Sequence, residues 1–306
     1  VKVKYVMIDS IYVNSVNFRT GKKDFDFING NIQLSNVLVD STLNEDSSRV
    51  LFSRQAAFRA DSFYSYNNNR PELVLKQMSF HGAHRTFSFG KVILNRFDDA
   101  SGAGRIMLDA SDLKFSGINT FAIVNNKNLL VDSIRCRQIK AYVPTLEKLP
   151  EINLLEGDEE VADSTHGFQN AYTISLNYLS FDNMEFIHGR NSNFDIGKTK
   201  FQLHNVSATR FSLLRKNPLH YIGEANLEIE YLKMASKDRQ YLFGLNGIKI
   251  NSLRKTFTIR SAFAKPILGE DAYANHYPFQ RDRFNLSMKA ITLDGIEMED
   301  LFNNKL

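Results

Sequence analysis

The stretch that decides the fold reads Phe89-Gly-Lys-Val92-Ile-Leu94-Asn-Arg-Phe97, then Ala110-Ser-Asp-Leu113-Lys-Phe115-Ser-Gly-Ile118, then Val131-Asp-Ser-Ile134-Arg-Cys136-Arg-Gln-Ile139. Each segment has four apolar positions separated by two residues, then one, then two. The second apolar positions, Val92, Leu113 and Ile134, are 21 residues apart. A repeat of this kind predicts an extended β architecture.

The pattern recurs toward both ends of the chain. It is present in Ile8-Asp-Ser-Ile11-Tyr-Val13-Asn-Ser-Val16, in Leu73-Val-Leu75-Lys-Gln-Met78-Ser-Phe80, and in Met288-Lys-Ala-Ile291-Thr-Leu293-Asp-Gly-Ile296. Aromatic and hydroxyl residues alternate in Thr86-Phe-Ser-Phe89, and strict alternation is typical of a strand with one buried face. The repeat therefore describes most of the chain.

The two-residue spacers carry a structural prediction. They include Asp9-Ser10, Asn14-Ser15, Ser35-Asn36, Ser116-Gly117, Asn246-Gly247, Asn251-Ser252 and Asp294-Gly295. Side chains of a regular strand alternate between faces, so apolar residues three apart would point to opposite faces unless a bulge intervened. Because the spacer residues tolerate left-handed backbone, we expect bulges there and strongly bent strands.

Two all-β architectures satisfy the pattern. One is an elongated, curled antiparallel β-meander that forms a taco-like groove, with each 21-residue unit making two strands of about ten residues. The other is a parallel β-solenoid with one unit per coil. Uneven intervals in the second half, together with Asn-Gly and Asp-Gly pairs suited to hairpins, favour the meander.

Domain organisation follows from a change in composition. We expect residues 1–144 to form an N-terminal β-repeat lobe and residues 172–306 to form a C-terminal β-repeat lobe that is continuous with the first. Residues 145–171 include Glu156-Gly-Asp-Glu-Glu160 and are expected to be an acidic loop or linker. A short helix is expected near Glu297 to Phe302.

The apolar positions of the repeat are the candidate functional residues, as the lining of a lipid groove or as a closed core. They are Ile11, Val13, Ile32, Leu34, Val92, Leu94, Leu113, Phe115, Ile134, Cys136, Phe201, Leu203, Ile248, Ile250, Ile291 and Leu293. Cys136, the only cysteine, occupies one of these positions, so we expect a buried, inert thiol and no disulfide within the chain.

Composition limits the classes of partner. The chain is 43% apolar and 24% charged, which is typical of a globular protein, and no window resembles a transmembrane helix. The net charge of +4 comes from scattered Lys and Arg residues, so we expect no nucleic acid partner.

Motifs for catalysis, cofactors and metals are weak, so we expect a protein that is not an enzyme and has no cofactor. His81 and His84 are three residues apart without the third ligand of a zinc motif. Gly102-Ala-Gly104 is too short for a dinucleotide fingerprint. Acidic pairs such as Asp98-Asp99 and Glu159-Glu160 lie in loop-like sequence, where solvation explains them.

The ends of the repeat resemble a known protein family. Ser10-Ile-Tyr-Val-Asn14, Ile28-Asn-Gly-Asn-Ile-Gln-Leu-Ser-Asn-Val37, Arg283-Phe-Asn-Leu286 and Ile291-Thr-Leu-Asp-Gly-Ile-Glu-Met-Glu-Asp-Leu301 are similar to the AsmA and TamB-like proteins of the bacterial cell envelope. The resemblance implies a taco-shaped β-groove that binds or conducts lipid acyl chains in phospholipid transport or outer-membrane assembly. Lipids, membrane surfaces and envelope proteins are the partners it implies.

The resemblance also implies where in the cell the protein is located. The chain begins without Met and inside a strand-like pattern, so we expect a longer protein whose preceding segment carries an export signal or a membrane anchor. The expected location is the periplasm or cell envelope. Two alternatives stay open: a structural or adhesive β-solenoid acting through its outer surface, and a β-helical enzyme acting on carbohydrate.

Overall fold

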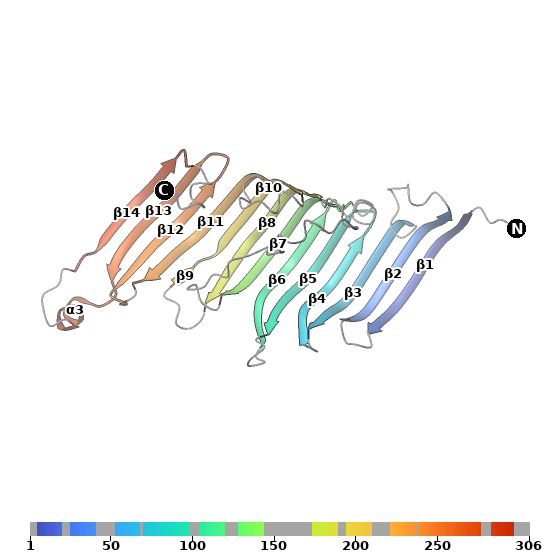
Figure 1. The fold of residues 1–306 in the computed structure, drawn as a ribbon, viewed down its shortest axis with the longest axis horizontal. Coiled ribbons are helices and arrows are strands. Elements are labelled where there is room, and N and C mark those ends of the chain that lie inside the picture. The colour runs from blue at the N-terminus through green and yellow to red at the C-terminus, as the bar shows by residue number, and fades with distance from the viewer. Residues whose placement is uncertain are drawn as a thin grey trace, which may run out of the picture.

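The chain forms one open, 14-stranded β-sheet, seen in a computed structural model (Figure 1). The structure describes residues 5–19, 25–40, 53–67, 70–97, 104–119, 128–143, 173–188, 194–209, 221–236, 238–276 and 283–296. Within those residues the substantial contacts between elements are those between strands of the sheet. The described part is therefore a single layer.

The strands follow each other across the sheet almost in sequence order. The first seven are β1 (Tyr5–Arg19), β2 (Phe25–Asp40), β3 (Ser53–Asn67), β4 (Arg70–His81), β5 (Thr86–Phe97), β6 (Gly104–Ser116) and β7 (Leu129–Val143). The others are β8 (Thr173–His188), β9 (Phe194–Ile196), β10 (Thr199–Thr209), β11 (Ile222–Ala235), β12 (Tyr241–Asn251), β13 (Thr256–Pro266) and β14 (Leu286–Asp294). A seven-residue helix, α3 (Glu270–His276), lies between β13 and β14.

The pairing confirms the meander and rules out the parallel solenoid. Neighbouring strands from β1 to β7 and from β8 to β14 are antiparallel. The exception is β7 with β8, which are parallel and pair from Leu129 with Ile174 to Val143 with His188. That pair joins the two predicted lobes within one sheet. The predicted acidic linker, 145–171, and the helix near Glu297 lie outside the described residues.

The 21-residue unit corresponds to one strand and its connection, so the prediction of two strands per unit is wrong. Val92, Leu113 and Ile134 lie on β5, β6 and β7. The error has a geometric cause. The spacing of two, one and two residues is a palindrome, so the pattern reads the same on strands that run in opposite directions.

The spacers have the expected left-handed backbone, but among the residues named below only Ser15 lies at a shift in strand register, so bulges in the strict sense are not general. In five of the seven predicted spacers the second residue has positive φ, and so does the second spacer residue in three further copies of the pattern. These eight residues, with φ from 51° to 76°, are Ser15, Asn36, Gln77, Asp112, Gly117, Gly247, Ala290 and Gly295. Six of them lie within strands, where left-handed backbone lets the apolar residues on both sides share one face, and Gly117 and Gly295 come directly after the last residues of β6 and β14.

The buried core lies along the central strands rather than between two layers. One cluster contains Ala60, Met78 and Phe89, and the next contains Ala110, Cys136 and Ile139. A third is formed by Ile118, Val131 and Leu176. These side chains are buried by their neighbours on the same face of the sheet, because rows of large side chains cover the small ones between them.

Candidate functional site

The candidate site is the apolar face of the sheet, which consists of rows of paired residues that run across the strands. Residues directly paired on adjacent strands point to the same face, so pairing defines each row. Row 1 contains Val13, Ile32, Phe58, Phe80, Phe87, Phe115, Ile134, Leu179, Leu203 and Ala225. Row 2 contains Ala60, Met78, Phe89, Leu113, Cys136, Phe181, Phe201, Leu227, Ile250, Phe257 and Leu293.

Row 3 crosses the sheet from β1 to β14 without a charged residue. It contains Phe18, Phe27, Phe63, Leu75, Val92, Ala110, Ile139, Met184, Thr199, Ile229, Ile248, Ile259 and Ile291. Thr199 is its one polar member and is 4% exposed. Its hydroxyl donates to the Gly197 carbonyl at 3.1 Å, so the row presents no unsatisfied polar group there.

All sixteen sequence candidates lie on the apolar face. Row 1 holds Val13, Ile32, Phe115, Ile134 and Leu203, row 2 holds Leu113, Cys136, Phe201, Ile250 and Leu293, and row 3 holds Val92, Ile248 and Ile291. Ile11 and Leu34 pair with each other beside row 1. Leu94 pairs with Leu73 and Leu108 beside row 3.

Exposure divides the candidates into core and surface. Cys136, Leu203 and Ile248 are buried, whereas Val13, Leu94 and Leu293 are 40%, 42% and 48% exposed. The other ten are intermediate. The face therefore has a packed floor and an accessible apolar surface. The buried candidates fit the interpretation as a core, and the exposed ones fit the interpretation as the lining of a lipid groove.

Several residues of this face were not among the sixteen candidates, although the repeat includes two of them, Phe80 and Ile139. Phe58, Phe80 and Phe87 belong to row 1, and Ile139 and Ile259 belong to row 3. The available signal was the alternation around Phe80 and Phe87, which predicts a strand but not its register. Phe58 lies in a stretch with no clear apolar period, so only its pairing with Ile32 and Phe80 reveals its role.

The surroundings of Cys136 favour an unreactive thiol. The thiol is 1% exposed and donates to the backbone oxygens of Gln138 and Ser111 at 3.3 and 3.4 Å. Burial raises the pKa of the thiol above its ordinary value. The thiolate is the nucleophilic form of cysteine. The raised pKa therefore keeps Cys136 as the unreactive thiol near neutral pH.

The opposite face is mainly polar and carries cross-strand ion pairs, although Val74 is buried there against Ile93 and Tyr64. Lys91 lies 3.2 Å from Asp109, and Lys249 lies 3.5 Å from Glu228. Arg135 stacks over Tyr178 at 5.1 Å on the same face. The two faces of the sheet therefore differ sharply in chemistry.

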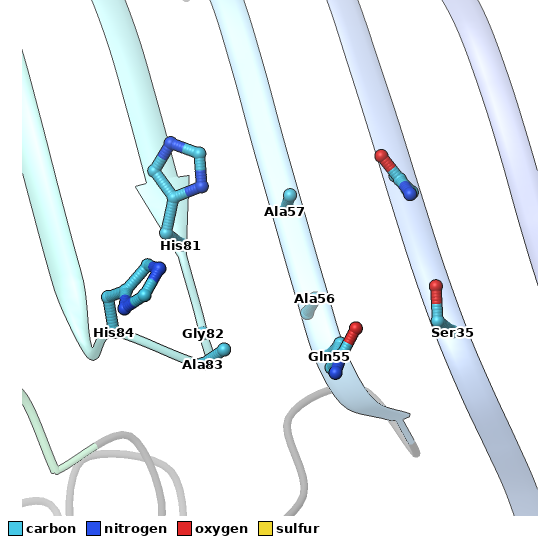
Figure 2. A pocket seen from close by; sticks show the side chains of 9 residues that line it. Ser35, Gln55, Ala56, Ala57, His81, Gly82, Ala83 and His84 are labelled. Atoms are coloured by element: carbon cyan, nitrogen blue, oxygen red, sulfur yellow. The ribbon is translucent and has the colours of Figure 1, made fainter.

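A small polar hollow of about 140 Å³ lies on this polar face at the turn between β4 and β5. Figure 2 shows His81 and His84 beside each other, with Gln55 and Ser35 on neighbouring strands. The two imidazole centroids are 6.4 Å apart. Among the described residues, no group of three or more His, Cys, Asp or Glu is placed to hold a metal ion.

Comparison with models of known protein families, with curated proteins and with solved structures gives no match. No helix among the described residues is long and apolar enough to cross a membrane. The site is therefore interpreted from its own geometry.

Proposed function

We propose that this chain is a non-enzymatic lipid-binding protein of the cell envelope whose apolar face carries acyl chains. The observation that carries the proposal is row 3, which crosses the sheet from β1 to β14 without a charge. A sheet normally covers its apolar face with a second layer. Here much of that face is partly exposed among the described residues, so a hydrocarbon ligand would cover surface that is otherwise wet.

The energetics of lipid transfer fit a continuous apolar surface. Moving a ~16-carbon acyl chain into water costs on the order of 13 kcal/mol, at about 0.8 kcal/mol for each methylene. A row without interruption lets a chain move without a charged residue in its path. The polar face, with its ion pairs, would stay in water.

Location and partners are proposed from the sequence resemblance to AsmA and TamB-like proteins. We place the protein in the periplasm or cell envelope, where phospholipid is transported or the outer membrane is assembled. Its partners would be lipid, a membrane surface and envelope proteins. The open, curled meander is the shape that the resemblance implies, and this agreement supports the proposal.

Native mass spectrometry of the purified protein tests the proposal directly. We expect co-purifying lipid whose acyl chains are released on denaturation. Equilibrium dialysis with radiolabelled palmitate gives the affinity. A protein that carries no lipid and binds no palmitate would contradict the proposed function.

Glutamate substitutions on the apolar face can be compared with the same substitutions on the opposite face. Val13 and Leu293 are exposed members of rows 1 and 2, and their neighbours Tyr12 and Thr292 are exposed residues on the other face. We expect Val13→Glu with Leu293→Glu to weaken palmitate binding, because a carboxylate would have to be desolvated under the chain. Tyr12→Glu with Thr292→Glu adds the same charge and should bind palmitate normally.

A further inference from the structure

An apolar hollow of about 240 Å³ opens on the apolar face over β2 to β5. Its walls are the side chains of Ile32 and Leu34 from β2, Phe58 from β3, Phe80 from β4 and Phe87 from β5. Ala56 of β3 lies in its floor. No side chain that lines the hollow has a hydrogen-bonding group.

The small side chain of Ala56 leaves room for the hollow among the larger side chains that line it. Beside row 1, Leu34 pairs with Ala56, and the next position across the sheet is Gly82 in the turn after β4. The backbone N–H of Gly82 donates to the Ala56 carbonyl at 2.6 Å, and a Cβ on Gly82 would lie 3.0 Å from that oxygen. A side chain on Gly82 would therefore crowd the Ala56 carbonyl, whereas the hollow itself is bounded at Ala56 by a single methyl group.

The hollow is elongated across the strands. Its wall in row 1 runs from Ile32 to Phe87 over four strands, which is about 14 Å at a spacing of about 4.8 Å. Phe80 and Phe87 meet edge to face at 6.3 Å and 84°. An occupant would therefore lie across the strands, in the direction of the apolar rows.

The lining selects hydrocarbon over peptide. A peptide segment in the hollow would bury N–H and C=O groups against side chains that offer them no hydrogen bond, whereas an alkyl chain has no such groups. An engineered cavity of about 150 Å³ holds the six carbons of benzene, so a hollow of this size would hold about nine carbons.

We propose that this hollow is a subsite that holds about nine carbons of one unbranched acyl chain, lying across β2 to β5. The inference rests on the proposed lipid-binding function and adds a place, a direction and a length to it. The remaining carbons and the head group would lie outside the hollow.

Tryptophan fluorescence can locate the chain, because the protein contains no Trp. Phe58→Trp places a single reporter in the wall of the hollow. Tyr64→Trp places one on the same strand but on the polar face, where Tyr64 pairs with Asp26 and Val74. We expect palmitate brominated near its methyl end to quench the fluorescence of the Phe58→Trp variant strongly and that of the Tyr64→Trp variant weakly.

Filling the hollow is the second test. Ala56→Leu extends a side chain into the hollow and should weaken palmitate binding by about tenfold, since it displaces carbons of the bound chain. Gln55→Leu adds a leucine at the exposed neighbouring position on the polar face and should leave the affinity within about twofold. Circular dichroism of both variants shows whether each retains the sheet.

The results of these experiments distinguish failure of the proposed subsite from failure of the proposed lipid-binding function. If palmitate binds the wild type but neither quenches the Phe58→Trp variant nor responds to Ala56→Leu, the subsite is wrong and lipid binding stands. If palmitate does not bind the wild type, the proposed function fails as well. Quenching of the Phe58→Trp variant remains decisive if Ala56→Leu does not fold.

Discussion

At the scale of single residues, the second position of each spacer controls the bend of the strand. Gly247 has φ of 61° on β12, and its place between Leu245 and Ile248 keeps both apolar residues on one face. A Cβ there would lie 2.8 Å from Nε of Arg260 on β13. Backbone conformation and side-chain packing thus both favour glycine at this point, although other residues adopt the same conformation in other strands.

Gly247→Ala is therefore expected to destabilise the protein by about 1–2 kcal/mol, the cost of left-handed backbone for a residue with a Cβ. Gly269→Ala is the control, because its Cβ would meet nothing within 4 Å and its φ is not positive. Urea unfolding followed by circular dichroism measures both. Equal stability of the two variants would show that the left-handed backbone at Gly247 tolerates a side chain at no cost.

Cys136 gives a second prediction for a single residue. Its raised pKa and its burial mean that little thiolate is present or accessible in the folded protein near pH 7. We expect a thiol reagent such as dithionitrobenzoate to react slowly with native protein and rapidly in urea. The native rate should rise only at alkaline pH, because a raised pKa moves thiolate formation upward. Rapid native labelling at neutral pH would contradict the burial of this thiol.

At the scale of elements, the parallel pair of β7 and β8 connects the two halves of the sheet. Its apolar side includes Ile139, which is 6% exposed, and Met184. Its polar side includes Lys140, whose Nζ is 3.8 Å from a carboxylate oxygen of Glu185. The two faces of this one pair should therefore contribute very different amounts to stability.

Ile139→Ala is expected to cost about 2–4 kcal/mol, because it leaves a cavity beside Ala110 and Cys136. Lys140→Ala removes a partly exposed ion pair and should cost no more than about 1 kcal/mol. The free energy of unfolding in urea distinguishes them. A similar loss of unfolding free energy in both variants would mean that the apolar side of the β7–β8 pair is not the main source of its stability.

The sequence predicts elements better than it predicts their connections. The spacing around Leu113 and Ile134 was sufficient to assign strands, their apolar face and left-handed backbone at residues such as Gly117. The same spacing is palindromic and therefore does not indicate the direction of a strand. It could not predict that β7 and β8 are parallel. The hollow at Ala56 also required the structure, because it depends on the register that places Ile32, Phe58, Phe80 and Phe87 side by side.

At the scale of the whole molecule, the sheet leaves an unusually large surface. The accessible area of the chain is 21538 Å², whereas a compact protein of 35.0 kDa would expose about 13,000 Å². Figure 1 shows one contribution among the described residues, since β1 and β14 lie at opposite ends of one broad layer. Stability thus depends on contacts between neighbouring strands and on packing within one face.

Small-angle scattering tests this shape. Thirteen strands lie side by side in the main path of the sheet, which gives a width of about 58 Å at a spacing of about 4.8 Å. A compact chain of 306 residues would have a radius of gyration of about 19 Å. We expect a larger value and a distance distribution with a long tail, because a broad single layer places much of its mass far from the centre. A radius at or below the compact value would mean that the sheet folds over on itself in solution, which would close the apolar face and remove the surface on which lipid binding depends.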